Sequence, residues 1–266
     1  MKKHNYILIT GLVLTGILLA ITIIAQFWTP YDVMSMHASL RHKAPSLAHL
    51  MGTDNFGRDI LSRAMKGCGT TFFIGMCTVI IGAFFGTIIG AITGYFGGII
   101  DEIVMRINDV VLSFPSVLLA LIFISFLGTG KYKIIVALGV MFIPSFARIV
   151  RSEVIRLKSQ EFVKSAKVMG VGTFRIIFVH IVPNIFVSML TAAAVGFNNA
   201  VLAEASMSYL GLGVVPPEPS LGLMLSEAQQ YIFISPWYAL FPGLVIVLII
   251  LGFGLISEGL REIAQD

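Results

Sequence analysis

The chain has 266 residues, of which 57% are hydrophobic and 12% are charged, and its mean hydropathy is +0.92. A water-soluble domain carries about 25% charged residues, so this composition excludes an ordinary soluble protein and indicates one that lies in a lipid bilayer. The formal net charge is +4. Because basic residues of membrane proteins gather on one side of the bilayer, this excess does not indicate a nucleic-acid partner, and we expect none.

Six apolar runs predict an all-α integral membrane protein with six transmembrane helices, because lipid offers no hydrogen-bond partner to backbone groups outside a helix. The first run follows Lys2 and Lys3 and is longer than the apolar core of a signal peptide, so we interpret it as an uncleaved span. Pro115 and Pro144 predict local kinks or breaks. The expected spans cover residues 6–28, 72–97, 111–128, 134–150, 182–203 and 238–257.

We expect one integral domain in two parts. Residues 1–71 would form the first span and an amphipathic outer segment, and residues 72–266 a five-helix core with a cytoplasmic loop at about 150–183. The outer loop 204–237 has no Lys or Arg, whereas the first outer segment, about 30–71, carries five. Both termini are predicted to be cytoplasmic, because eleven of the eighteen basic residues then lie inside: Lys2, Lys3, Arg106, Arg148, Arg151, Arg156, Lys158, Lys164, Lys167, Arg175 and Arg261.

Glycine recurs at every fourth residue of the second expected span. Small residues at this spacing let another helix backbone approach closely, so we predict a packing seam inside the bundle or at a subunit interface. The alternative is that glycine is simply frequent in membrane helices. The glycines concerned are Gly82, Gly86, Gly90, Gly94 and Gly98.

Few residues in the chain suggest chemistry. Cys68 and Cys77 would lie roughly 13 Å apart in a helix, too far for a disulfide. His37, His42 and His49 do not have the spacing of a compact metal site, so we expect solvated loop histidines and no bound metal. The sequence has no P-loop and no HExxH or GxSxG motif. We therefore expect no enzymatic activity and no cofactor on this chain.

Residues 148–167 interrupt the apolar pattern with eight charged residues. Their insertion into a bilayer would cost on the order of 20 kcal/mol, so we place them in the cytoplasm. A helix is expected from 151 to 168, ended by Gly170 and Gly172. Its apolar face would lie on the membrane surface or fit a groove on a cytoplasmic partner. That face is predicted to contain Phe162, Ala166 and Met169.

Polar residues gather near the outer end of the fifth expected span. Asn198, Asn199 and Glu204 are candidates for a substrate path, because polar groups inside a membrane are costly unless they serve a function. The alternatives are that Glu204 ends the helix in water and that the asparagines hydrogen-bond to neighbouring helices. Glu102 with Arg106, and Arg106 with Asp109, have the spacing of helical ion pairs at the cytoplasmic edge.

The sequence KSAKVMG (164–170), followed after nine residues by HIVP (180–183), resembles the EAA loop of ABC importer permeases. Four longer motifs in the same order are similar to the second permease subunit of dipeptide, oligopeptide and nickel importers. They are LMGTDNFGRDILSR (50–63), DEIVMRINDVVLSFPSVLLA (101–120), SYLGLGVVPPEPSLG (208–222) and QQYIFISPWYALFPG (229–243). The chain departs from the family at Lys164, an acidic position, at Ser165 for alanine, and at Leu221 for tryptophan.

The resemblance implies a type I ABC importer permease fold with a cytoplasmic coupling helix, in the plasma membrane of a bacterium. It implies a homologous permease as heterodimer partner, two ATPase subunits that bind ATP and Mg, and an extracellular substrate-binding protein. The loop 204–237 would shape the outer mouth and meet that binding protein. The residues expected to couple to the ATPase are Glu161, Lys164, Ser165, Ala166, Lys167, Met169 and Gly170.

The resemblance implies transport of short peptides, with nickel or a metal–chelator complex as the alternative cargo. The residues do not separate the two. A channel or secondary transporter that works without an ATPase is a third possibility, and transport by the purified chain alone would favour it.

Overall fold

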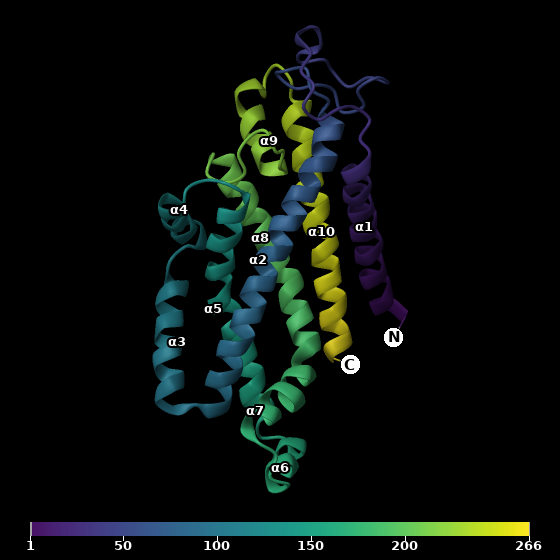
Figure 1. The fold of residues 1–266 in the computed structure, drawn as a ribbon. Coiled ribbons are helices and arrows are strands. Elements are labelled where there is room, and N and C mark those ends of the chain that lie inside the picture. The colour runs from purple at the N-terminus through teal and green to yellow at the C-terminus, as the bar shows by residue number, and fades with distance from the viewer. Residues whose placement is uncertain (1, 266) are drawn as a thin grey trace.

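The computed structural model describes residues 2–265, and the described chain is helical apart from its loops and one isolated bridge between Thr53 and Asp59. The long helices form a bundle, which Figure 1 shows from the side. The helices are α1 (Lys2–Phe27), α2 (Ile60–Phe96), α3 (Gly98–Ser113), α4 (Ser116–Leu127), α5 (Lys131–Leu157), α6 (Glu161–Val168), α7 (Thr173–Arg175), α8 (Phe186–Tyr209), α9 (Leu221–Ala228) and α10 (Trp237–Gln265).

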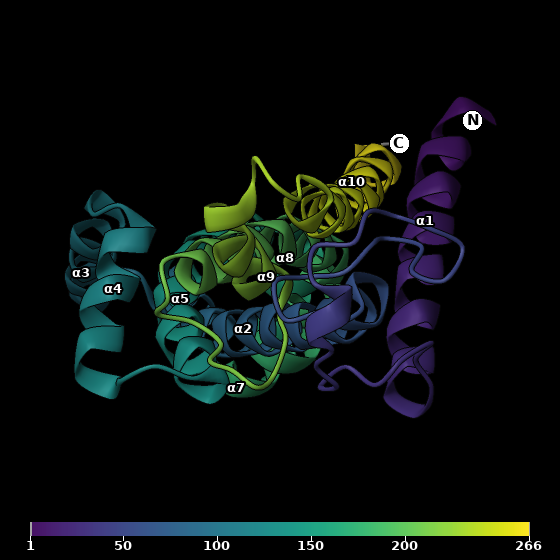
Figure 2. The ribbon, with the colours of Figure 1, turned by 90° about the horizontal axis from the view of Figure 1, so that it is seen from above.

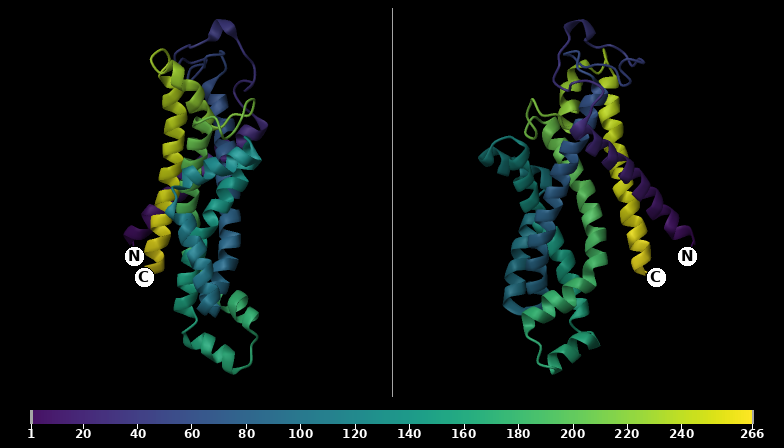
Figure 3. Two further views of the ribbon diagram at one scale, coloured as in Figure 1. Left: turned by 90° about the vertical axis from the view of Figure 1, so that its left-hand side faces the viewer. Right: turned by 45° about the vertical axis from the view of Figure 1, so that its right-hand side comes forward.

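Short helical turns complete the fold: η1 (Ala38–Leu40), the π-helical η2 (Ile176–Ile181), η3 (Val182–Ile185) and η4 (Gln229–Tyr231). One end of the bundle is covered by residues 28–59, which we call the cap segment, together with α9. The opposite end carries α6 and α7, and both terminal helices have their free ends on that side (Figures 1 and 3). We call these the capped end and the α6 end.

Five helices are long and apolar enough to cross a membrane: α1, α2, α5, the run Thr173–Tyr209 that ends in α8, and α10. The span expected over 111–128 is not one straight helix, because the chain bends by 94° between α3 and α4, at the break that Pro115 predicts. Phe114 has an extended backbone there, as the residue before a proline prefers, and Pro115 has no N–H to continue α3. Pro144, in contrast, lies within an uninterrupted α5.

Helix α2 begins at Ile60, about twelve residues before the expected start at 72, so the residue 71 boundary falls inside it. Its first turn is capped by Asp59, whose carboxylate accepts hydrogen bonds from the Ser62 backbone N–H (2.8 Å) and hydroxyl (2.7 Å). Hydropathy missed this part because it is polar. At 1.5 Å per residue the 37-residue helix is about 55 Å long, well beyond the roughly 30 Å hydrocarbon core.

Helices α2 and α5 pack closely along the glycine seam. A Cβ atom on Gly86 would lie 2.5 Å from the Cβ of Phe146, and one on Gly90 would lie 2.4 Å from the carbonyl oxygen of Ala147. Gly82 and Gly94 likewise face α5. Gly98 is a correction to the predicted seam: α2 ends at Phe96, and the positive φ of Gly97 and Gly98 turns the chain into α3.

The remaining helices flank this pair. Helix α1 packs on α10, where a Cβ on Gly259 would lie 2.6 Å from the Cβ of Leu8. Helices α3 and α4 stand at the opposite edge, and Figure 2 shows them separated from α1 by the rest of the bundle. The predicted helix 151–168 is wrong as one element. Residues 151–157 extend α5, and a turn at Lys158–Gln160 separates them from α6.

Candidate functional site

Helix α6 projects from the bundle on a short loop (Figure 3). Its C-terminus is closed by a Schellman motif: the N–H of Val171 donates to the carbonyl of Ala166, and the N–H of Gly170 donates to that of Lys167, each at 3.0 Å. Gly170 has a φ of +75°, which an L side chain rarely adopts. The glycine therefore ends α6 sharply, and no atom lies within 4 Å of where its Cβ would be.

One face of α6 is buried against the same chain. Val163 and Ala166 pack with Ala91 of α2, Val154 of α5 and Ile177 of η2 in an aliphatic cluster. Ala166 is only 3% exposed. The predicted apolar face is therefore divided: Ala166 lies inward, while Phe162 and Met169 lie outward.

The opposite face of α6 forms an apolar tip. Val168 is 89% exposed and Met169 is 75% exposed, and Phe162 of α6 and Phe174 of α7 are also exposed. Glu161, Lys164 and Ser165 share the exposed side, and the carboxylate of Glu161 accepts a hydrogen bond from the Lys164 ammonium at 2.8 Å. The sequence analysis missed Val168 and Phe174. The apolar Val168 beside the basic Lys167 was the signal that could have revealed the tip.

Polar contacts fasten the α6 region to the end of α2. The Lys158 ammonium donates to the carbonyl of Gly94 at 2.8 Å, and the Lys167 ammonium lies 5.1 Å from the centre of the Tyr95 ring. The Arg151 guanidinium of α5 donates to both carboxylate oxygens of Asp101 in α3, at 2.5 and 2.6 Å. The base of α6 thus contacts α2, and α5 holds α3.

Of the two ion pairs expected within α3, the structure contains one, and the other acid pairs with α5 instead. Arg106 and Glu102 lie 3.6 Å apart on the exposed surface, as their spacing predicts. Asp109 instead accepts a hydrogen bond from Arg148 of α5 at 2.5 Å, because α5 passes beside this face of α3.

A groove of about 690 Å³ lies between α5, α8 and the bend from α3 to α4. Asn199 lines it, as do hydroxyl groups and many apolar side chains, and no charged side chain is among the described residues of its wall. The polar lining residues are Ser145, Ser188, Thr191, Asn199 and Ser206. Asn198, one residue away, faces α10, where its amide nitrogen lies 3.6 Å from the position of a Cβ on Gly254.

Glu204 does not end α8 in water. Its side chain is fully buried, and its carboxylate accepts hydrogen bonds from the hydroxyls of Thr71 (3.0 Å) and Ser208 (2.7 Å). Thr71 also accepts a bond from the Leu221 N–H at 3.4 Å. The carboxylate therefore joins α8 to α2 and to the start of α9, outside the groove.

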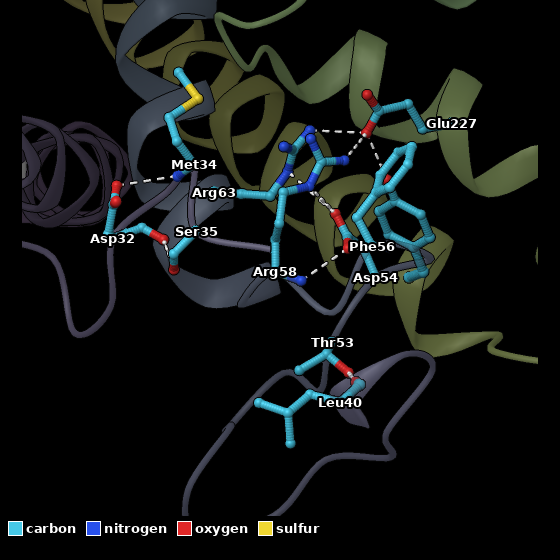
Figure 4. Close-up of polar contacts among 11 residues, drawn as sticks. Asp32, Met34, Ser35, Leu40, Thr53, Asp54, Phe56, Arg58, Arg63 and Glu227 are labelled. Atoms are coloured by element: carbon cyan, nitrogen blue, oxygen red, sulfur yellow. Dashed lines mark hydrogen bonds and ion pairs between the residues drawn. The ribbon is translucent and has the colours of Figure 1, made fainter. Parts of the chain in front are cut away.

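A second group of charges lies at the capped end, and we call it the cap charge cluster: Asp54, Arg58, Arg63 and Glu227 (Figure 4). Arg58 Nε donates to Asp54 at 2.5 Å. One oxygen of Glu227 accepts from Arg58 (3.0 Å), from Arg63 (2.7 Å) and from the Tyr238 hydroxyl (2.6 Å). The cluster is largely buried, and Arg63 is only 1% exposed.

Two of the cap histidines are structural, which corrects the expectation of solvated side chains at His42 and His49, whereas His37 is exposed as expected. His49 is buried, and its Nδ1 lies 2.9 Å from the Asp59 carboxylate. His42 contacts the Ser235 hydroxyl at 3.0 Å. Among the described residues no three His, Cys, Asp or Glu side chains are grouped to hold a metal ion, and Cys68 and Cys77 are both free thiols.

Comparison with known proteins decides the family. The family described as "Binding-protein-dependent transport system inner membrane component" matches residues 86–265. The chain belongs to this family. The dipeptide transport system permease protein DppC of Alkalihalophilus pseudofirmus is 40% identical over 260 residues, which cover 98% of this chain and 86% of that protein. The glutathione transport system permease protein GsiD of Pectobacterium atrosepticum is 38% identical over 247 residues, which cover 92% of this chain and 82% of that protein.

A solved structure of the MetNI methionine ABC transporter in an inward facing conformation shares the fold of this transport-system component. It superposes with a TM-score of 0.56 at 20% identity and covers 76% of this chain and 96% of that one. These findings confirm the resemblance and the predicted all-α permease fold of ABC importers. They make this family member a multi-pass permease subunit, with the bent pair α3–α4 counted as one of its spans.

Proposed function

We propose that the chain carries short peptides across the bacterial plasma membrane, after an extracellular binding protein delivers them, driven by ATP hydrolysis on separate ATPase subunits. The relatives named for dipeptides and for glutathione, itself a small peptide, support this substrate class. The observation that carries the ATPase-driven mechanism is the α6 tip. It is an apolar surface built on a helix whose other face is already locked into the chain.

Helix α6 is the part that docks on an ATPase subunit. Val168 and Met169 lie outside the bilayer-spanning part of the bundle, where exposed apolar surface is unfavourable unless a partner covers it. Glu161, Lys164 and Ser165 border this surface and supply its polar rim. Ala166 and Gly170 support this surface from inside the chain. Ala166 anchors α6 in the aliphatic cluster, and Gly170 ends the helix. Because α6 is packed against α2 and α5, a push on its tip moves that pair as a rigid body.

The groove is one half of the peptide path, and a homologous permease supplies the other half. It lies between α5, α8 and the α3–α4 bend. Its uncharged wall suits a zwitterionic peptide, because neither end of the peptide meets a fixed charge that would hold it. Asn199 is the path residue that we retain from the sequence analysis. Asn198 and Glu204 lie outside the groove and serve helix packing.

The α6 end faces the cytoplasm in this proposal, together with both termini. Five basic residues in the first outer segment argued against that orientation. Arg58 and Arg63 are paired with Asp54 and Glu227 inside the cap. Long translocated segments follow the positive-inside rule less strictly than short loops, so we keep this orientation.

The test is reconstitution of the chain with its partner permease, its ATPase subunits and its binding protein in liposomes. We expect ATP-dependent uptake of a labelled dipeptide. Uptake by the chain alone would instead indicate a channel or secondary transporter. Uptake of nickel that does not depend on peptide would overturn the substrate class.

The docking claim is tested by co-purification of the ATPase subunits. We expect Val168→Asp to reduce the co-purified ATPase at least tenfold. The matched control is Ile99→Asp, an exposed apolar residue in the first turn of α3 at the same end of the bundle. Equal ATPase recovery with both variants would show that the α6 tip is not the docking surface.

A further inference from the structure

Two sequence motifs that the peptide path does not use meet at the capped end. The segment 50–63 supplies Asp54 and Arg58 from the cap segment and Arg63 from α2. Glu227 comes from α9, whose first two residues belong to the segment 208–222. Arg63 and Glu227 are 164 positions apart in the sequence, and their side chains are 2.7 Å apart in the fold.

The geometry centres on one oxygen atom. Glu227 Oε2 receives hydrogen bonds from three different segments: Arg58 of the cap segment, Arg63 of α2 and Tyr238 of α10. Asp54 Oδ2 holds Arg58 from the other side and lies 3.7 Å from Arg63 Nε. Figure 4 shows both arginines between the two carboxylates. Removal of Glu227 alone would therefore remove hydrogen bonds from α9 to three neighbouring segments at once.

Stability alone does not explain this arrangement. Two positive and two negative charges balance, yet apolar side chains of similar volume are often as stabilising as a buried ionic group. Within the described part of the chain, Nε and Nη1 of Arg63 have no hydrogen-bond partner, so the guanidinium is incompletely satisfied. What ionic hydrogen bonds add is direction, because they fix the position of one helix relative to another.

Helix α9 is placed to affect the groove. It packs on the last turns of α8, where a Cβ on Gly222 would lie 2.7 Å from the backbone of Ala205, and the Ser226 hydroxyl donates to the carbonyl of Tyr209 at 2.8 Å. Ser206 of the same turns lines the groove. At its other end, α2 contacts the α6 region at Gly94 and Tyr95. One long helix therefore contacts both the docking loop and the helix that borders the groove.

We propose that Glu227 is a positioning residue for transport. It fixes α9 to the capped end of α2, so that movement entering at α6 reaches the outer end of the groove through α2. The inference rests on the proposed ATP-driven mechanism and adds the residue that completes the mechanical link. In the reverse direction, a binding protein that displaces α9 changes the affinity at the α6 end through the same contact, since coupling between two binding sites is reciprocal in free energy.

The test compares Glu227→Gln, Arg63→Gln and the double variant in the reconstituted complex. Three quantities are measured: the amount of assembled complex, its basal ATPase rate, and the rate with peptide-loaded binding protein. We expect assembly and basal rate within about twofold of wild type for each variant, and at least a tenfold loss of stimulation. The double variant should lose no more stimulation than either single variant, because each single substitution already removes the contact between Arg63 and Glu227.

Two further variants keep the result interpretable. Glu218→Gln removes the partner of Lys131, a less buried carboxylate at the capped end, and should keep stimulation. Tyr238→Phe removes only one hydroxyl donor to Glu227 and should lower stimulation about threefold in a fully folded protein. If Glu227→Gln does not assemble, Arg63→Gln and Tyr238→Phe decide, because the assembled complex of each should still lose stimulation by the factor expected for it.

The inference is overturned if the cluster variants keep wild-type stimulation of the ATPase rate, or if stimulation falls only in proportion to the amount of assembled complex. It is also overturned if Glu218→Gln loses as much stimulation as the cluster variants do. Failure of the proposed function looks different, because the wild-type complex would then show no ATP-driven peptide uptake at all.

Discussion

At the capped end four segments meet around ionised side chains, whereas at the α6 end the segments meet around aliphatic ones. The cap charge cluster has its hydrogen-bond donors and acceptors buried together, and Glu227 alone accepts three bonds. The α6 cluster buries Val163 and Ala166 but leaves Val168 and Met169 in solvent. The cap is therefore a closed structure, and the α6 end is open for a partner.

The difference has a mechanical consequence. Ionic hydrogen bonds hold two helices at a fixed orientation, while an aliphatic contact permits small sliding. Between the two ends, α2 and α5 are joined by glycines that bring the backbones together. In the proposed mechanism, a displacement at the α6 end is carried by this closely packed helix pair to the cap, whose ionic contacts keep α9 fixed to α2.

The largest effect is expected at the seam. Gly90→Leu would place a side chain where a Cβ already lies 2.4 Å from the Ala147 carbonyl oxygen, so α2 and α5 must separate. We expect a loss of about 3 kcal/mol or more, the upper range for overpacking, and little folded protein. Thermal unfolding in detergent measures this. Gly16→Leu in α1 is the control, since no atom lies within 4 Å of its Cβ position. Equal melting temperatures would show that the seam is not tightly packed.

The next largest effect is expected at the end of α6, where a substitution should affect ATPase association but not folding. Gly170→Asp should insert and fold but lose the ATPase subunits, because a φ of +75° disfavours aspartate and the end of α6 would shift. Gly172→Asp is a close control: it is also open, but its φ is −62° and it is the N-cap of α7, where aspartate is favourable. Co-purification of the ATPase measures both. If the Gly170→Asp variant still co-purifies with the ATPase subunits, α6 does not act as a rigid docking helix.

The sequence predicted these two ends unequally. Hydropathy located the spans, because lipid requires long apolar helices, and the local glycine spacing located the seam. The end of α6 was also predictable, since Gly170 supplies the backbone conformation that a Schellman motif needs. Each of these features depends on residues close together in the chain.

The cap could not be predicted in the same way. Nothing local in the segment 50–63 indicates that Arg63 meets Glu227, since that pairing depends on how α2, α9 and α10 pack. The start of α2 at Ile60 was missed for a related reason, because its polar first turns are buried by the cap and not by lipid. Likewise, periodicity on an eight-residue helix did not show that Ala166 turns inward.

A smaller effect concerns the attachment of α3 to α5. Asp101→Asn would leave the Arg151 guanidinium with a neutral partner in place of a bidentate carboxylate. The pair is partly exposed, so we expect a loss of about 1 kcal/mol of folding stability, less than a fully buried charged hydrogen bond contributes. Chemical denaturation measures it. Glu102→Gln should cost less, because its pair with Arg106 lies on the surface at 3.6 Å. A larger loss for Glu102→Gln would contradict this ranking.

The smallest effect distinguishes two roles for Lys167. Its ammonium lies over the Tyr95 ring, a contact worth about 0.5–1 kcal/mol at an exposed site. If Lys167 holds α6 to α2, Lys167→Met should lower peptide uptake about twofold while the ATPase subunits still co-purify fully. Arg156→Met is the control, because Arg156 is an exposed cation of α5 that pairs within its own helix, with Glu153. If Lys167→Met instead reduces co-purification as Val168→Asp does, Lys167 belongs to the docking surface, and the link from α6 to α2 depends on Lys158 and the aliphatic cluster.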